Sequence, residues 1–429
     1  MAIYSKNKAR LFFLNATGDA VTIGNTSSVI RNVTLEGLYF GQGAGVEKTS
    51  GSHINIVNCD EIELRKLYMG DIYDGITCDG IARSEFTDIW FRRQSGRSAP
   101  SRHCFNLFAN ATTGLPVVNL KLTRCDAVDP IKFQTFVKLS SADWVNMLAC
   151  HANFTEHFLH ITHGAANIVD VYVNNCYMDL AYDSNVLIDG AGGGLCDGIK
   201  FNNTYFRASE GYGLEVVGTG AIQNITVSSN CRFDNSELGA IKITNEAVVT
   251  FHLDDCVIGR DIGAGNARPI IETHALRNKI SGNSFRVNSG LVDIKAERST
   301  PSGVLLVTGN IFNASGSSSV IAQTNFVDVE YAANTGLGDI PLAMGLKQSG
   351  SVTGTTNSAY GGFGLYASAN VAVLFSPAFS ATPTVNLNAD TGGGVTGVAV
   401  NNITASGFNA VFYGVTNGGT PTAQWDAYI

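Results

Sequence analysis

Short apolar runs recur along the chain at intervals of 25 to 28 residues, each preceded by a polar turn. The clearest marker is an Asn or Asp before the run, and its copies are Asn175, Asn203, Asn230, Asp255, Asn283 and Asn310. A second apolar run, such as Val186–Ile188 or Leu214–Val216, lies between consecutive copies. Short strands separated by Gly, Asn, Asp or Ser turns explain this pattern, and no helical period of 3.6 is sustained.

A unit of this length cannot bury its apolar residues alone, so the units are expected to stack into a solenoid with one continuous core. In five units the marker position is accompanied by a cysteine, namely Cys125, Cys150, Cys176, Cys231 and Cys256, and Thr204 takes this place once. Free cysteine packs as a small buried hydrophobe, so these residues predict an interior column rather than metal or redox chemistry. The Asn column is interpreted as structural too, through stacked side-chain amides.

The composition excludes several classes of protein. Only 15% of the 429 residues are charged, against about 25% in a typical globular domain, and the net charge is −8. This acidity argues against nucleic-acid binding. No apolar run is long enough for a membrane span, and the start, Met1 to Phe13, lacks the features of a signal peptide. Nine cysteines without a CxxC pair suggest neither a disulfide framework nor a zinc site.

Charge is scarcest at the C-terminus, where residues 348–429 contain no Lys, Arg or Glu and only two Asp. Five short strands are expected there, which suggests a small antiparallel β-sandwich; they are Val371–Phe375, Thr384–Leu387, Val395–Val400, Phe408–Tyr413 and Gln424–Ile429. A free surface with so little charge is poorly soluble, so burial against identical copies is expected. The predicted domains are therefore a solenoid over 1–339, a connector over 340–364 and a trimerisation sandwich over 365–429.

The coil pattern resembles the right-handed parallel β-helix of bacteriophage tailspikes and capsule depolymerases. The segments Phe375–Pro383 and Asn402–Phe408, with Trp425, resemble the C-terminal β-sandwich of phage tail fibres. Together these resemblances cover about residues 20–429. They imply an all-β homotrimer, made in the host cytoplasm and carried on the phage tail or baseplate of the virion. They further imply that it binds, and often cleaves, bacterial surface polysaccharide.

The resemblance supplies no catalytic residues, because this family shares no catalytic motif. Its members usually begin with a particle-binding head, and no such head is expected in this chain, which we interpret as trimmed or attached through another protein. The sandwich is also a candidate carbohydrate-binding module. Catalytic residues must therefore be argued from their position in the repeat.

Four acidic residues fall at intervals of 27 in the loops that follow the markers: Glu156, Asp183, Glu210 and Glu237. If the coils stack in register, their carboxylates form one column. Like charges about 5 Å apart should raise the pKa of at least one of them, which supplies the proton donor and ionised partner that glycoside hydrolysis needs. Neighbouring carboxylates would suit a retaining enzyme and alternate ones an inverting enzyme. Ordinary solvated turns and a Ca²⁺ site are the alternatives.

A second column, four residues after each marker and three after the cysteine position, contains Asp179, Arg207 and Asp234. We expect the two acids to join the catalytic candidates and Arg207 to contact substrate. Tyr182 and Tyr212 flank the acidic column and are candidates for stacking on sugar rings.

The loop from Arg92 to His103 holds four arginines, and guanidinium groups suit carboxylated sugars. Arg92 and Arg93 are therefore candidate contacts to an acidic polysaccharide. A contact to a neighbouring subunit and simple exposure to solvent are equal alternatives.

The histidines at 157, 160 and 163 invite a zinc interpretation. Alternate residues of a strand face opposite sides, so His160 is expected to point away from His157 and His163. No metal site and no cofactor are therefore predicted.

The leading hypothesis is a phage tailspike that binds an acidic capsule, exopolysaccharide or O-antigen and depolymerises it as an endo-acting glycoside hydrolase. A polysaccharide lyase that uses Arg207 or a loop arginine as base is one alternative. A non-catalytic receptor-binding fibre and a purely structural spike are the others.

Overall fold

The computed structural model describes residues 2–13, 16–42, 48–92, 101–162, 165–259, 269–286, 293–312, 321–332, 334, 348–353, 356–360, 365–374, 384–389, 395–404, 406–414 and 422–428. The chain divides into two compact units, one made by most residues before 339 and the other by residues 339–429 with the short segments 299–302 and 321–329. Within the described part of the chain, nothing folds into a helix long and apolar enough to cross a membrane.

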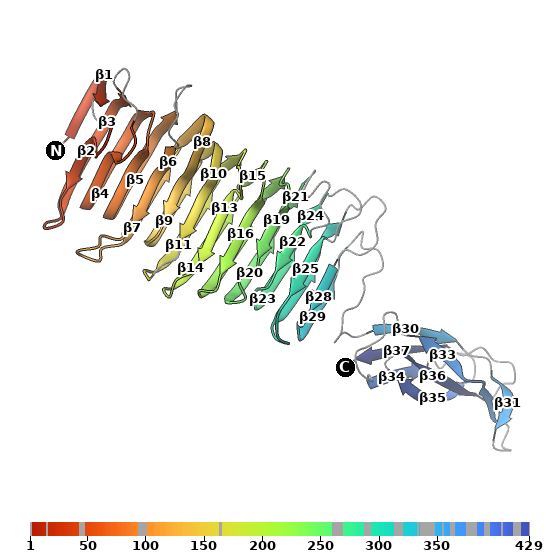
Figure 1. The fold of residues 1–429 in the computed structure, drawn as a ribbon. Helices are drawn as coiled ribbons and strands as arrows, with labels where there is room; N and C mark the ends of the chain where they lie inside the picture. The colour runs from red at the N-terminus through yellow and green to blue at the C-terminus, as the bar shows by residue number, and fades with distance from the viewer. Residues whose placement is uncertain are drawn as a thin grey trace. The chain divides into compact units, whose positions relative to one another are not determined.

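The strands described between residues 2 and 332 form a parallel β-solenoid, in which each strand pairs with its counterpart one coil further along the chain (Figure 1). The first of its three sheets contains the short strands β12 (Tyr177–Asp179), β15 (Tyr205–Arg207), β18 (Arg232–Asp234), β21 (Val257–Ile258), β24 (Ser284–Phe285) and β27 (Ile311–Phe312). The second contains β7 (Val117–Thr123), β9 (Ala142–Leu148), β11 (Ile168–Asn174), β14 (Cys196–Asn202), β17 (Ile222–Ser228), β20 (Val248–Asp254), β23 (Arg277–Ser281), β26 (Val304–Thr308) and β29 (Asp328–Ala332).

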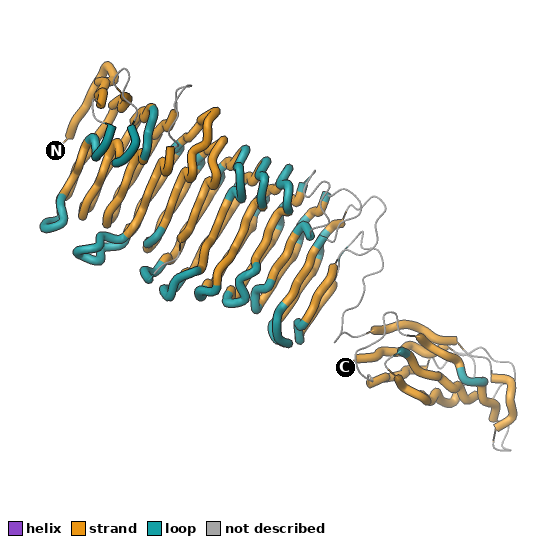
Figure 2. Tube along the Cα trace, in the orientation of Figure 1, coloured by secondary structure: helices purple, strands orange, loops and turns teal. Residues whose placement is uncertain are grey.

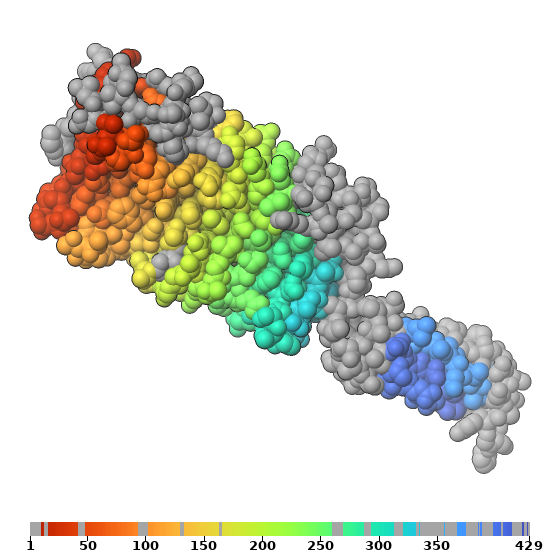
Figure 3. Space-filling model, in the orientation of Figure 1, coloured from red at the N-terminus to blue at the C-terminus, as the bar shows by residue number. Residues whose placement is uncertain are grey.

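The third sheet contains β2 (Val21–Gly24), β6 (Ser101–Phe108), β13 (Val186–Gly190), β16 (Tyr212–Gly218), β19 (Gly239–Ile243), β22 (Ile271–Thr273), β25 (Ile294–Glu297) and β28 (Ile321–Thr324). Longer strands complete the sheets, and several of them bend from one sheet into another: β1 (Ala2–Phe13), β3 (Ile30–Gln42), β4 (Ser52–Gly70), β5 (Asp74–Arg92), β8 (Asp126–Leu139) and β10 (His151–Thr162). The turns lie at the corners between sheets (Figure 2). Successive coils follow one another along the solenoid surface (Figure 3).

The expected parallel β-solenoid is confirmed. Each coil contributes a strand to each of three sheets, whereas the sequence pattern showed only two apolar runs in each repeat. The sequence pattern merged two strands into one run, because only two or three residues separate the end of each second-sheet strand from the start of the first-sheet strand that follows it. For example, β11 ends at Asn174 and β12 begins at Tyr177. The residues between them form the corner, where Asn175 adopts a left-handed backbone with φ of 54°. Asn tolerates this conformation better than most residues, which explains its recurrence there.

The cysteine column lies inside the solenoid, as the sequence predicts. Cys150 is buried, and its Sγ donates to the carbonyl oxygen of Leu122 at 3.4 Å. The register also corrects one alignment. Ser284 pairs with Val257, so Asn283 and Asn310 continue the interior cysteine column instead of the corner column. Their buried amides bond along the axis, with Asn283 Nδ2 donating to Asn310 Oδ1 at 3.0 Å.

The second unit contains two antiparallel sheets, which confirms a small antiparallel β domain. One sheet contains β30 (Gln348–Thr353), β37 (Thr422–Tyr428) and β34 (Thr384–Ala389), and the other contains β31 (Thr356–Tyr360), β32 (Leu365–Ser368), β33 (Val371–Leu374), β35 (Val395–Thr404) and β36 (Gly407–Gly414). Phe408 and Phe412 of β36 pack with Ala423 and Ala427 of β37, so the two sheets share a core.

Two of these strands, β30 and β31, lie in the segment 340–364, where a connector was expected. Their Ser-, Thr- and Gly-rich sequences are typical of loops, but backbone pairing with β37 and β32 makes them strands. The segment Phe375–Pro383, which carried part of the resemblance, lies outside the described residues.

Candidate functional site

The four residues of the acidic column lie at the same corner of successive coils, but Asp183 is one residue out of register with Glu210, because Ala181 pairs with Ser209 and Val186 with Leu214, both 28 residues apart. The backbone N–H of Glu210 donates to the carbonyl of Ala181 at 3.0 Å, and that of Glu237 donates to Ser209 at 2.8 Å. Strands β10 and β13 pair with the same offset of 27, so Glu156 and Asp183 lie on neighbouring coils as well. Asp183, Glu210 and Glu237 are exposed, and Glu156 is partly exposed. The column lies at the corner between the first and third sheets, where the chain turns from β12, β15 and β18 towards β13, β16 and β19.

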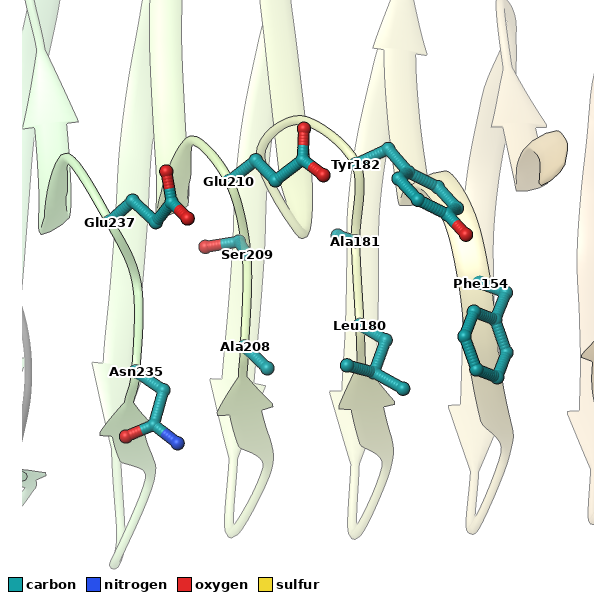
Figure 4. A pocket seen from close by; sticks show the side chains of 9 residues that line it. All are labelled: Phe154, Leu180, Ala181, Tyr182, Ala208, Ser209, Glu210, Asn235 and Glu237. Atoms are coloured by element: carbon teal, nitrogen blue, oxygen red, sulfur yellow. The ribbon is translucent and has the colours of Figure 1, made fainter. Parts of the chain in front are cut away.

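Two members of this column, Glu210 and Glu237, border a cavity of about 210 Å³ (Figure 4). Its other lining residues come from four coils: Phe154, Leu180, Ala181, Tyr182, Ala208, Ser209 and Asn235. The small side chains of Ala181, Ala208 and Ser209 make the hollow, because larger residues there would fill it. The arrangement combines two carboxylates with the rings of Tyr182 and Phe154 on one surface.

The other two members, Glu156 and Asp183, are not among the residues that line this cavity. They instead lie near His157, a buried residue on the same corner. The predicted column is therefore interrupted by one residue of register between Asp183 and Glu210, and its side chains form two local groups.

The second predicted column is confirmed as a set of neighbours on the first sheet, since Arg207 pairs with Asp234 in register. Arg207 Nη1 lies 3.3 Å from Asp179 Oδ2. Asp234 Oδ2 accepts hydrogen bonds of 2.5 Å from Tyr205 and from Arg232 Nε. Both carboxylates are thus bound in ion pairs, which suits them to hold the arginines rather than to transfer protons.

Neighbouring charges and hydrogen bonds also hold Arg207 of this column and the adjacent Tyr205 in their ordinary ionic states. The hydrogen bond from Arg207 to the Tyr177 hydroxyl, followed by the charge of Asp179, raises the pKa of the guanidinium. Burial of Tyr205, together with its hydrogen bond to Asp234, raises the pKa of the phenol to about 12. Arg207 is therefore a permanent cation and Tyr205 a neutral phenol.

An aromatic and ionic strip beside this column was missed by the sequence analysis. The rings of Tyr177 and Tyr205 lie 5.0 Å apart, and the His151 ring lies 5.3 Å from Tyr177. Asp126 joins His151 Nδ1 at 3.0 Å to Arg92 Nη2 at 2.9 Å. The signal was present for four of these residues, because each directly follows the interior cysteine column, but it needed the coil register to be seen; they are Asp126, His151, Tyr177 and Tyr205.

Arg92 is thus placed on this strip, whereas Arg93 lies outside the described residues. Tyr212 does not flank the acidic column as expected. Its side chain is 3% exposed and packs under Lys242, whose Nζ lies 5.0 Å from the ring centroid. Tyr212 begins β16 just after a corner, where three consecutive residues are buried, so strict strand alternation does not apply.

The expectation that His160 points away from His157 is wrong, because the two ring centroids are 5.2 Å apart. Strand β10 bends between the first and third sheets at this place. Phe154 adopts a φ of 56°, and the pairing with β8 shifts register after Asn153. Alternation is also lost between the two histidines, where His157, Phe158 and Leu159 are all buried in succession. His163 lies outside the described residues.

No protein-family profile and no curated protein sequence matches the chain. Solved structures do match it. The tailspike protein gp49 from Pseudomonas phage LKA1 is 12% identical, with a TM-score of 0.57, and the match covers 96% of this chain and 88% of that one. A double mutant of the tailspike protein of E. coli bacteriophage HK620 is 9% identical, with a TM-score of 0.51, covering 100% and 86%. The chain has the fold of phage tailspikes.

At these low identities the tailspike likeness concerns the fold, and the roles of individual residues rest on the geometry described above. Within this tailspike fold, the cavity beside Glu210 and Glu237 and the strip around Arg207 both use side chains at or next to the first sheet. The two features are the candidate functional surfaces of the chain.

Proposed function

We propose that the protein is a phage tailspike that binds an acidic bacterial surface polysaccharide and cleaves it internally as a glycoside hydrolase. One observation carries the proposal: Glu210 and Glu237, from successive coils, border the same cavity as the ring of Tyr182. Aromatic rings beside paired carboxylates provide both a surface for sugar rings and the groups for acid–base chemistry. The fold shared with phage tailspikes supports the same conclusion.

The two glutamates fit the requirements of hydrolysis. Neighbouring strands are about 4.8 Å apart, which places carboxylates from successive coils near the separation of a retaining pair, about 5 to 5.5 Å. One glutamate then protonates the leaving oxygen while the other attacks the anomeric carbon, and water completes the reaction. Phe154 and Tyr182 extend the surface along the axis (Figure 4), in the direction that a polymer would follow.

The acidic nature of the polymer is inferred from the strip on the first sheet. Arg207 and Arg92 are each oriented by a carboxylate, at 3.3 Å and 2.9 Å respectively. Guanidinium groups fixed in this way bind carboxylated sugars well, because both hydrogen bonds and charge contribute.

We further propose that three copies associate through the C-terminal unit and that the trimer is carried on the tail of the virion. Residues 348–429 hold only two charged side chains, and Leu374 on β33 is 78% exposed. An apolar, nearly uncharged surface of this kind favours burial against another copy. Sedimentation of the full chain should give the mass of a trimer, and a monomer would contradict this assignment.

The hydrolase proposal is tested by incubating the protein with purified capsule of the host and counting new reducing ends. Wild type should release them steadily, while Glu210→Gln and Glu237→Gln should each lower the rate at least a hundredfold. Glu63→Gln, an exposed glutamate distant in sequence, is the matched control and should cleave normally. Unchanged cleavage in both pocket variants would overturn the site assignment. Polymer that stays intact with wild type would favour a receptor-binding fibre.

A second candidate function, a polysaccharide lyase, is favoured by the strip. Asp126 holds Nδ1 of His151 at 3.0 Å, which leaves the other ring nitrogen as a base. Arg207, bonded to Tyr177, is placed two strands away and suits the carboxylate of a uronic acid. Elimination creates an unsaturated sugar that absorbs in the ultraviolet, so absorbance that rises with cleavage would identify a lyase.

A further inference from the structure

Three potential metal ligands converge at the corner of β10. A carboxylate oxygen of Glu156, a carboxylate oxygen of Asp183 and a ring nitrogen of His157 all lie within 4.8 Å of one another. Ligands bound to one ion at about 2.1 Å are some 3 to 4 Å apart. Asp183 is exposed and Glu156 partly exposed, so small rotations of their side chains would close the set.

The histidine of this group has an independent sign of ligand binding. His157 is only 5% exposed, and its Nδ1 donates to the backbone carbonyl of Ser184 at 2.8 Å. A carbonyl only accepts, so Nδ1 carries the proton and Nε2 holds the lone pair. Among the described residues, no hydrogen bond to Nε2 is formed. A buried imidazole fixed by a carbonyl on one nitrogen and open on the other is how metal-binding histidines are held.

Two further histidines lie near this group. The His160 ring is 5.2 Å from that of His157, which makes it the nearest imidazole. His103 lies two coils earlier at the register position of His157, since both pair with Thr135. It is 4% exposed, and neither of its ring nitrogens bonds to any described residue.

We propose that Glu156, His157 and Asp183 bind one first-row divalent metal ion, with His160 as the nearest additional donor. The mixture of imidazole and carboxylate favours Zn²⁺ or Mn²⁺ over Ca²⁺ and Mg²⁺, which prefer oxygen ligands alone. The ion links two neighbouring coils through β10 and the turn before β13. Its exposed side remains open to water or to an oxygen of a sugar. Asp183 follows Tyr182 of the cavity, so the ion lies next to the proposed polysaccharide site.

The test uses the full chain without a purification tag, dialysed against a chelator and then titrated with Zn²⁺ and with Co²⁺. Wild type should bind one equivalent, and Co²⁺ should develop visible absorption bands shifted by nitrogen ligation. Asp183→Asn and Glu156→Gln should weaken Zn²⁺ binding at least tenfold. Glu210→Gln and Glu237→Gln are the matched controls from the same acidic column, and their affinity should stay within about twofold of wild type.

Several results would overturn the proposal. If Zn²⁺ binding to wild type does not saturate at concentrations below about 1 mM, the chain has no site of this kind. If all four variants lost Zn²⁺ affinity equally, the ion would be attracted by the charge of the whole acidic column and not by a specific site. Ca²⁺ binding as tight as that of Zn²⁺, or Co²⁺ spectra unchanged by His157→Gln, would exclude the imidazole as a ligand. Because metal binding is read directly, these results are independent of whether the protein cleaves polysaccharide.

Discussion

Arg207 donates from Nη1 to the hydroxyl oxygen of Tyr177 at 3.0 Å, across one step of the first sheet. With Asp179 on its other side, the guanidinium is held in place although it remains half exposed. A cation oriented in this way should contribute strongly to binding a carboxylated polymer. A hydrogen bond to a charged group is worth about 1.5 to 3 kcal/mol, so Arg207→Gln should weaken the affinity for acidic capsule about tenfold or more.

Arg207→Lys separates charge from geometry in the same titration. It keeps the charge but loses the planar fork, so its affinity should fall between those of wild type and Arg207→Gln. Arg65→Gln, at a half-exposed arginine that forms a surface ion pair with Glu63, should bind like wild type. Equal affinities for all four proteins, measured at the same low salt, would remove Arg207 from the binding surface.

The interior should be sensitive to loss of a single ring. Phe206 and Phe233 stack at a centroid distance of 4.4 Å with an interplanar angle of 7°, and both are fully buried. Phe206→Ala leaves a cavity that the rigid coils on both sides cannot fill, so it should lower the free energy of unfolding by about 3 to 5 kcal/mol. Leu148→Ala, at a largely exposed position, should cost much less. Denaturant melts of the two variants compare them directly.

The nine cysteines should be inert in the native protein. All are free and buried, and burial raises the pKa of Cys59 to about 11 and that of Cys196 to about 12. Thiolate is the reactive form, so an aromatic disulfide reagent at pH 8 should label none of them. Nine should react after denaturation. Rapid labelling of even one thiol in the folded state would show that a part of the column opens to solvent.

The sequence alone could predict the solenoid and the placement of Glu210 beside Glu237, because both follow from the repeat length, whereas the 28-residue offset between the coils of Asp183 and Glu210 breaks the four-residue column. An interval of 27 residues equals one coil at Glu210 and Glu237, so residues in the same turn must become neighbours. The same argument placed Arg207 beside Asp234. These predictions rest on the length of the repeat alone and do not depend on the path of the chain within a coil.

The remaining features depend on that path. Strand alternation failed at His157 and His160, and again at Tyr212, because corners bend the strands and change which side a residue faces. Asn283 was misassigned because Gly282 occupies the left-handed corner position, with φ of 67°, and moves the Asn to the interior. The cavity beside Glu210 required small side chains at Ala181 on one coil and at Ala208 and Ser209 on the next, which no single segment reveals.

Asp293 should make stability depend on pH in an unusual direction. Burial raises the pKa of its carboxyl from 3.8 to about 7. Between these values the folded chain keeps a proton that the unfolded chain has lost. The contribution to stability is therefore complete below pH 4 and disappears as the pH rises through 7. A shift of this size corresponds to at most about 4 kcal/mol.

Asp293→Asn removes this titration while preserving the shape of the side chain. The difference in unfolding free energy between variant and wild type should increase from pH 4 to pH 8 in favour of the variant, because only wild type must bury a charge. Glu297→Gln, in the same coil at a more exposed position, is the control. Its unfolding free energy should not gain on that of wild type as the pH rises. Parallel curves for Asp293→Asn and wild type across this range would show that the carboxyl is already solvated when ionised.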